Sequence, residues 1–69
     1  MSKADKMLLE LGWEQIEEAF SDWYTYRNKR TGRELVFQND YQAVATYGDM
    51  IFGIALVQAI ALKCEELGW

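Results

Sequence analysis

The first apolar residues of the chain recur at the spacing of one helical face. Four of them fall at positions i, i+3, i+4 and i+7 of this pattern: Ala4, Met7, Leu8 and Leu11. Ser2 precedes them and can cap a helix, because its hydroxyl can accept a hydrogen bond from a free backbone N–H of the first turn. Gly12 can end the helix in a left-handed conformation, with Trp13 as the hydrophobic residue that follows such an end. The pattern therefore predicts a helix over residues 3–11.

The middle of the chain changes to the two-residue alternation of strands. Trp23–Tyr26 consists of strong strand formers, and the polar stretch Asn28–Gly32 is typical of a hairpin loop. Alternation then continues over residues 34–38 and 43–47, with a turn between them. We expect an antiparallel meander over residues 22–47. The residue patterns of two flanking segments, 13–19 and 50–54, are compatible with short strands but do not decide whether strands form there.

The last apolar segment returns to a helical period, from about Ala55 to Leu67. Six of its apolar side chains fill one arc and are expected to face the sheet: Leu56, Val57, Ile60, Ala61, Cys64 and Leu67. Leu62 falls outside this arc and forms a second, smaller apolar strip with two neighbouring alanines. Gly68 can end the helix as Gly12 ends the first one. Because residue 68 is expected at a frayed end, an alanine there should cost less stability than an alanine at position 12.

These elements predict one α+β domain spanning residues 1–69, with a short N-terminal helix, a three- to four-stranded antiparallel meander and a C-terminal helix packed on the sheet. The composition is 51% hydrophobic and 14% aromatic, which is too apolar for an intrinsically disordered chain. A domain of this size buries only roughly 60% of the surface of its unfolded chain. We therefore expect dense aromatic packing, self-association or both.

Composition also excludes several chemistries. The chain has no histidine and one cysteine, so it can form neither a histidine-based acid–base site, nor a histidine-ligated zinc site, nor an intrachain disulfide. Cys64 is expected to be a packing residue, because the end of a helix disfavours a thiolate. The carboxylates lie in polar stretches and the glycines match no phosphate-binding loop. We expect no enzymatic activity, no cofactor and no metal.

The hydropathy of the chain gives no sign of a membrane protein. Its longest apolar run, Met50–Leu62, is interrupted by Gln58 and is shorter than the roughly 20 residues that a membrane-spanning helix needs. The single unpaired thiol and the lack of a signal peptide indicate a cytoplasmic protein.

Charge is distributed unevenly along the chain. The net charge is −4, yet four of the seven positive charges lie close together, at Arg27, Lys29, Arg30 and Arg33. Aromatic residues precede these cations, and rings beside cations on a sheet can hold single-stranded nucleic acid. The simpler interpretation is a solvated hairpin tip over a core of aromatic side chains, because alternation places Tyr24 and Tyr26 on one face and Trp23 on the other. Nucleic-acid or nucleotide binding by this hairpin is therefore the second functional hypothesis.

The leading hypothesis is non-enzymatic protein–protein contact. If both helices cover one face of the sheet, aromatic rings on the other face stay partly exposed, and such a surface usually marks an interface. The candidate contact residues are Trp23, Tyr24, Tyr26 and Leu62. We expect a protein partner and self-association as well.

The two ends of the chain carry a family resemblance. One end reads Ala4-Asp5-Lys6-Met7 and Leu11-Gly12-Trp13-Glu14; the other reads Gln58-Ala59-Ile60 and Lys63-Cys64-Glu65-Glu66-Leu67-Gly68-Trp69. They resemble short proteins encoded by phages and prophages of Gram-positive bacteria, whose central hairpin is similar to Tyr26–Lys29 with Leu35–Phe37. The apolar Met50–Leu56 departs from them, because relatives often have a polar helix start there.

This resemblance implies a phage setting, the cytoplasm of a host bacterium and a helix–meander–helix order. In that setting the leading hypothesis becomes a non-enzymatic phage accessory protein that contacts a host or phage protein. A sharper form of it is inhibition of a host defence or regulatory protein, because a small acidic protein can occupy a basic, nucleic-acid-binding groove. The resemblance transfers no catalytic residue.

Overall fold

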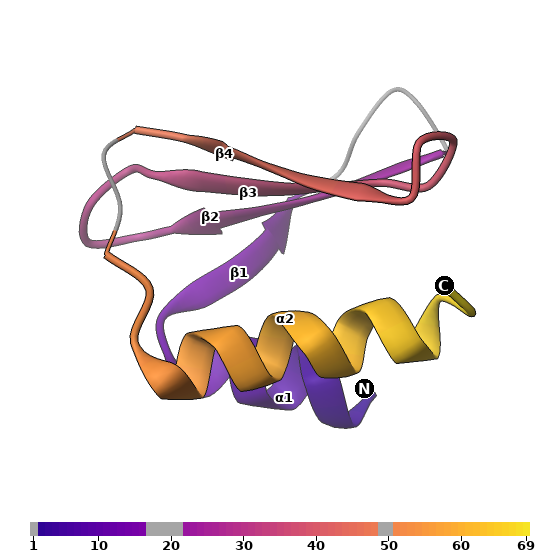
Figure 1. Ribbon diagram of the computed structural model, residues 1–69. Coiled ribbons are helices and arrows are strands. Elements are labelled where there is room, and N and C mark those ends of the chain that lie inside the picture. The colour runs from indigo at the N-terminus through magenta and orange to yellow at the C-terminus, as the bar shows by residue number, and fades with distance from the viewer. Residues whose placement is uncertain (1, 17–21, 49–50) are drawn as a thin grey trace.

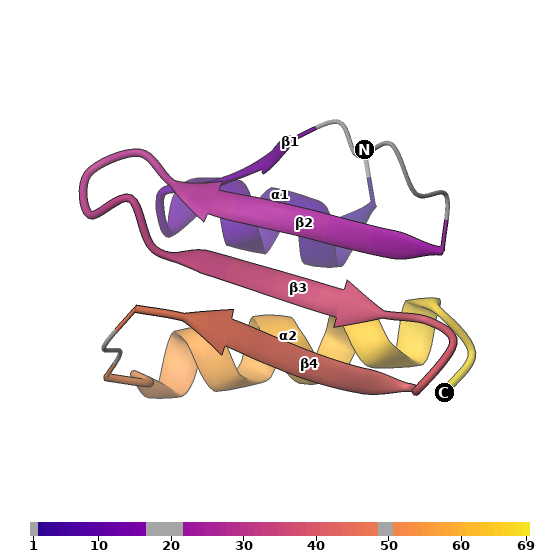
Figure 2. The same ribbon diagram turned by 90° about the horizontal axis from the view of Figure 1, so that it is seen from above.

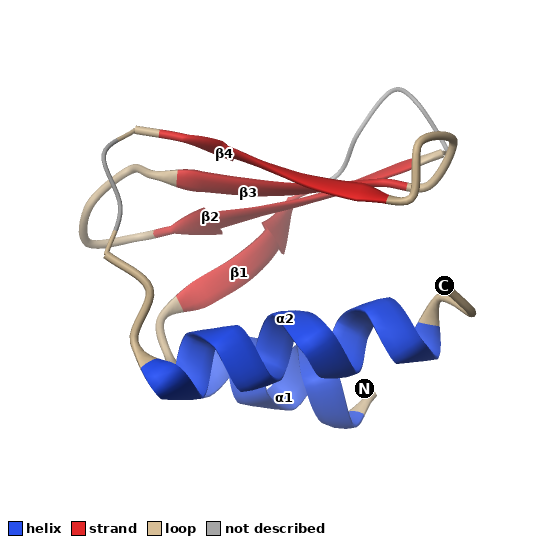
Figure 3. Ribbon diagram, viewed as in Figure 1, coloured by secondary structure: helices blue, strands red, loops and turns tan. Residues whose placement is uncertain are grey.

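The computed structural model of the chain describes residues 2–16, 22–48 and 51–69. The elements follow one another as a helix, four strands and a second helix (Figures 1 and 3): α1 (Lys3–Glu10), β1 (Trp13–Ile16), β2 (Trp23–Asn28), β3 (Glu34–Gln38), β4 (Ala43–Tyr47) and α2 (Ile54–Glu66). The predicted α+β architecture is confirmed. The segment after Gly12 is a strand, whereas Ile51–Gly53 is not, and α2 begins directly after it. Residues 17–19 and residue 50, which belong to the two possible flanking strands, lie outside the described residues.

The four strands form one antiparallel meander in the order β1-β2-β3-β4. Tyr26 of β2 lies opposite Leu35 of β3, and Phe37 of β3 lies opposite Val44 of β4. Because side chains alternate between the faces of a sheet, these residues share one face. Both helices cover this same face and run antiparallel to each other, with α1 behind β1 and β2 and α2 behind β3 and β4 (Figure 2).

The core lies between this face and the two helices. Its buried members come from every element except β4: Leu8, Trp13, Tyr26, Leu35, Phe37, Leu56 and Ala59. The ring of Phe37 meets the ring of Tyr26 edge-on, at 5.5 Å between centroids. The expected dense aromatic packing is thus present, since three of the seven members are aromatic.

Helix α1 begins and ends as the sequence predicts. The Ser2 hydroxyl accepts a hydrogen bond from the backbone N–H of Asp5 at 3.0 Å, and Gly12 has a φ of +94°, the left-handed region that glycine favours. A second cap comes from α2, because the Glu66 carboxylate accepts from the backbone N–H of Ala4 at 3.0 Å. Leu11 is a correction to the predicted helical face, because it is exposed at the end of the helix.

Helix α2 buries a different arc from the one predicted. Ala59 and Lys63 are buried beside Leu56, while Val57 and Ala61, which were expected to face the sheet, are exposed. At 100° per residue the centre of this buried arc is turned by about 100° from the centre of the predicted one, and Leu56 is the residue that the two arcs share. The reason is that α2 packs against α1 as well as against the sheet. Leu62 is consequently half-buried rather than exposed.

The C-terminal turn is held in place rather than frayed. Gly68 has a φ of +81°, and the backbone N–H of Trp69 donates to the carbonyl of Cys64 at 3.1 Å, the hydrogen bond of a Schellman motif. The Trp69 indole N–H donates to Asn39 Oδ1 at 2.8 Å, and its ring lies 6.5 Å from that of Phe37. The expectation of a frayed end at Gly68 is therefore wrong, because the residue beyond it docks on the sheet.

Candidate protein-interaction surface

Four segments that are distant in sequence meet at one end of the molecule, on the left in Figure 1. They are the C-terminal end of α1, the turn between β2 and β3, residues 51–53 and the first turn of α2. Two open hollows lie between them, one of about 430 Å³ beside Leu9 and Lys29 and one of about 250 Å³ beside Arg33 and Ile51. The chain termini lie at the opposite end (Figure 1).

This end exposes a group of large apolar side chains, which we call the apolar patch: Ile51, Phe52, Ile54 and Val57. Ile51 is 92% exposed and Ile54 is 74% exposed. The patch continues along α2 to Ala61, because positions 54, 57 and 61 are neighbours on one side of a helix. It exists because α2 turns its other side to α1 and the sheet. The sequence signal for it was the apolar run from residue 50 to 62, which is too apolar for a single buried arc.

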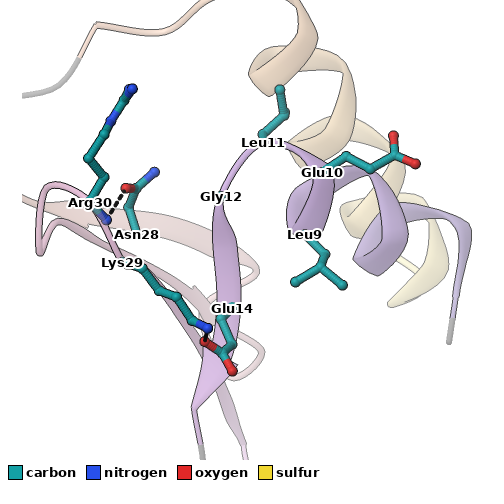
Figure 4. A pocket seen from close by; sticks show the side chains of 8 residues that line it. All are labelled: Leu9, Glu10, Leu11, Gly12, Glu14, Asn28, Lys29 and Arg30. Carbon is teal, nitrogen blue, oxygen red and sulfur yellow. Dashed lines mark hydrogen bonds and ion pairs between the residues drawn. The ribbon is translucent and has the colours of Figure 1, made fainter.

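The four cations of the β2–β3 hairpin do not form one cluster. The Arg27 guanidinium contacts the Glu34 carboxylate at 2.6 Å across the two strands. The Lys29 ammonium contacts the Glu14 carboxylate of β1 at 2.9 Å, at the side of the larger hollow (Figure 4). Exposed ion pairs of this kind contribute little stability, but they neutralise half of the positive charge that the sequence concentrates here.

Arg30 and Arg33 form no ion pair with any side chain that the structure describes. The hairpin tip that carries them is ordered from within by Asn28, whose buried side-chain oxygen accepts from the backbone N–H groups of Arg30 at 3.0 Å and Thr31 at 3.2 Å. The Arg30 side chain extends away from the Lys29–Glu14 pair (Figure 4). The hairpin therefore presents two cations on a fixed backbone, at the edge of the smaller hollow.

The aromatic residues that were expected at an interface lie elsewhere. Tyr26 is 1% exposed and Tyr24 is half-buried, because both point toward the helices. Placing Tyr26 on a contact surface is therefore wrong for this chain, because its side chain is buried, whereas the role of the half-buried Tyr24 stays a prediction. Trp23 lies on the opposite face of the sheet, half-buried, and its indole N–H donates to Asp40 at 3.1 Å. Because Trp23 and the two tyrosines lie on opposite faces of the sheet, the structure does not bring the four predicted contact residues together.

A buried polar cluster, which the sequence reasoning missed, joins the helices to the sheet. The Tyr26 hydroxyl donates to the Asp5 carboxylate of α1, and the Lys63 ammonium of α2 lies 3.1 Å from the same oxygen. Lys63 also lies over the rings of Tyr24 and Tyr26, at 5.5 and 5.8 Å from their centroids. A lysine four residues after Ala59 on an apolar helix was the available signal for this cluster.

The protonation states of this cluster are set by its contacts. Burial acts to raise the pKa of Asp5, but hydrogen bonds from Tyr26 and Lys63 outweigh it and hold the pKa below the ordinary 3.8. Burial and the adjacent Asp5 carboxylate raise the pKa of Tyr26 far above the ordinary 10.0. At neutral pH the carboxylate is therefore ionised and the phenol is protonated. This is the arrangement of a structural ion pair, because the shifts of Asp5 and Tyr26 both move their pKa values away from pH 7.

The remaining candidates for reactive chemistry are few. Burial raises the pKa of the Cys64 thiol, and the residue packs against the core, in agreement with its predicted packing role. Among residues 2–16, 22–48 and 51–69, acidic side chains and the cysteine nowhere gather into a group of three that could hold a metal ion. In the part of the chain that the structure describes, no helix is long and apolar enough to cross a bilayer.

Three comparisons with known proteins, against family models, curated sequences and solved structures, each found no match. Function has to be argued from the surface itself.

Proposed function

We propose that this protein acts by binding another protein through the apolar patch. The observation that carries the proposal is the exposure of four apolar side chains within one short segment at one end of the molecule (Figure 1): Ile51, Phe52, Ile54 and Val57. Burying apolar side chains against a partner is favourable by about 25 cal/mol per Å² removed from water. Exposed apolar groups of this kind on a small domain are typical of an interaction surface.

The fold does not account for the two most exposed of these residues, Ile51 and Ile54. The core is formed by other side chains of α2 and the sheet, among them Leu56 and Ala59. A polar residue at position 51 or 54 would leave that core unchanged, since both side chains are mostly in solvent. The apolar character of these two residues therefore has a use outside the folded monomer.

Nucleic-acid binding by the hairpin has less support. Arg27 and Lys29 already contact carboxylates, and Tyr24 and Tyr26 face the helices, where they cannot stack on bases beside the cations. Retention on single-stranded DNA at low salt tests this alternative directly, because such binding must weaken steeply as salt is added.

The resemblance to phage and prophage proteins supplies a setting for the proposal. In that setting the chain is an accessory protein in the host cytoplasm, and inhibition of a host defence or regulatory protein is one outcome of the contact. This part of the proposal rests on the two ends of the chain and not on the patch.

The test compares a variant of the apolar patch with a control variant at an exposed position outside the patch. Ile51→Ser/Ile54→Ser removes the two most exposed side chains of the patch. Tyr41→Ser removes a side chain that is 72% exposed, in the β3–β4 turn at the other end of the molecule (Figure 1). Both should change the free energy of unfolding by no more than about 1 kcal/mol, because exposed positions contribute little to stability.

The tagged wild type and both variants are then used for affinity capture from a lysate of the source cell or its host, after nuclease treatment, and for sedimentation velocity alone. We expect the wild type and the Tyr41→Ser control to capture the same protein or to form the same self-associated species. The Ile51→Ser/Ile54→Ser variant should do neither. If the isoleucine variant behaves as the wild type does, the patch is not the binding surface and the proposal is wrong.

A further inference from the structure

We infer that the partner presents an acidic segment, in which an apolar side chain enters the smaller hollow while neighbouring carboxylates meet Arg30 and Arg33. This inference rests on the proposed function and adds the chemical class of the partner. It follows from the shape of the hollow and from the charge around it.

The hollow has an apolar floor and a cationic edge. Leu11, Trp13 and Leu56 line it from α1, β1 and α2, and Ile51 stands beside them as part of the apolar patch. Arg30 and Arg33 line it from the hairpin. A space of about 250 Å³ that is open to solvent accepts a side chain rather than a small-molecule cofactor, since ligand pockets are larger and more enclosed.

The charge around the smaller hollow favours an anionic partner, because two arginines and, in the described part of the chain, no acidic side chain line it. At the same end of the molecule Glu14 and Glu34 are engaged by Lys29 and Arg27. Glu10 lines the larger hollow rather than this one. The guanidinium groups of Arg30 and Arg33 have no carboxylate partner among the described side chains. They are thus the charges available to pair with a ligand, and opposite charge both speeds association and sets the orientation of a bound segment.

Two other occupants fit this surface less well. A second copy of the chain would bring the same two arginines into the interface, because a symmetric dimer uses the same patch on both subunits. An anionic membrane would contact the protruding Ile51 and Ile54 but would leave the concave hollow behind them unfilled. A peptide segment fills the hollow and meets the cations at once.

The experiment selects ligands and then tests their charge. The wild-type protein is immobilised and used to select from a library of short random peptides, and selected peptides are assayed in solution by fluorescence anisotropy. We expect enrichment of aspartate and glutamate beside leucine, isoleucine or phenylalanine. A synthetic peptide with each acid replaced by its amide should bind at least about tenfold more weakly at low salt.

Two protein variants that each remove two positive charges show which cations contact the acidic peptide. Arg30→Gln/Arg33→Gln should weaken binding of the acidic peptide by about three- to tenfold at low salt, and the difference should shrink as salt screens the pairs. Lys3→Gln/Lys6→Gln removes the same charge from the exposed side of α1 and should leave binding within about twofold of the wild type. Circular dichroism of both variants confirms that they are folded.

The outcomes separate this inference from the proposed function. If the selected peptides are neutral or basic, if no peptide is enriched, or if the arginine variant binds as the lysine variant does, the inference is wrong. It is also wrong if the protein binds phosphatidylserine vesicles and no peptide. The proposed function survives the first and third of these results as long as Ile51→Ser/Ile54→Ser still abolishes binding, and it fails if that variant binds normally.

Discussion

The Lys63 ammonium lies 3.1 Å from the Asp5 carboxylate, so the two helices are joined by a partly buried ion pair. Lys63 is buried on the side of α2 that faces α1 and the sheet. Tyr26 completes the contact from β2. One polar cluster therefore links α1, α2 and the sheet, and it lies on the inward side of α2 beside Ala59.

Removing one partner of this pair should be costly. Asp5→Ala leaves the Lys63 ammonium buried without its counterion, which should lower the free energy of unfolding by about 2–4 kcal/mol. The double variant Asp5→Ala/Lys63→Met removes both charges and should cost less than Asp5→Ala alone. Urea unfolding of the two single variants and the double variant measures the coupling, and Lys6→Met on the exposed side of α1 is the control. Strictly additive effects would show that the pair is not coupled.

The same carboxylate makes stability depend on pH in the acid range. The pKa of Asp5 is lower in the folded chain than its ordinary 3.8, so the unfolded chain binds the proton more readily. The contribution of Asp5 is complete above pH 3.8 and is lost as the pH falls through the lower folded value. The stability difference between the wild type and Asp5→Asn, followed by thermal unfolding from pH 7 downward, should be constant at first and then shrink. A difference that grows on acidification would contradict this sign.

Alanine should be unfavourable at both left-handed glycines. Gly12→Ala and Gly68→Ala should each cost about 1 kcal/mol, because a Cβ is strained in that conformation. The cost at Gly12 should be the larger one, since the added Cβ would lie 3.4 Å from Asn28 Nδ2, while nothing lies within 4 Å at Gly68.

Gly68→Ala should also release Trp69 from Phe37 and Asn39, which a change in the NMR shift of its indole N–H would detect. Gly53→Ala is the control, because Gly53 has an ordinary φ of −70° and open space around it. If Gly68→Ala changes the free energy of unfolding and the indole shift as little as Gly53→Ala does, the C-terminal turn does not hold Trp69 against Phe37 and Asn39.

Thr25 offers a stabilising substitution. It is buried on the sheet face that points away from the helices, opposite Val36, and its hydroxyl has no hydrogen-bond partner among the described residues. A buried hydroxyl without a partner is unfavourable. Thr25→Val should therefore raise the free energy of unfolding by up to about 1 kcal/mol, whereas Thr25→Ser, which keeps the hydroxyl and loses the methyl group, should lower it. A destabilising Thr25→Val would mean that the hydroxyl is satisfied by a group outside the described residues or by water.

Local chemistry made most of the fold predictable. The capping serine, the left-handed glycines and the alternation of residues 23–47 act over a few neighbouring residues, and the structure places the helix ends and three strands where those signals lie. The short β1 was the least certain strand, because its only strong signals are Trp13 and Ile16 and its existence depends on pairing with β2.

The candidate site was predicted less well, for a reason that lies in α2. Its apolar residues spread around the helix more widely than one buried face requires, so periodicity alone could not say which arc turns inward. The side chains that turn out to be exposed, Ile54 and Val57, are as apolar as the buried Leu56. Tyr26 was misplaced in a similar way, because alternation puts Tyr24 and Tyr26 on one face without saying which face the helices cover.

The sequence by itself determined the order of the elements, their ends and the absence of histidine and disulfide chemistry, because these depend on neighbouring residues and on composition. Only the tertiary structure decided that both helices lie on the same face of the sheet. It also decided that Lys63 of α2 contacts Asp5 of α1, and that the hairpin cations and the apolar patch lie at the same end of the molecule. These relationships join residues far apart in the chain. They depend on how α1 and α2 pack together on the sheet, which no local pattern specifies.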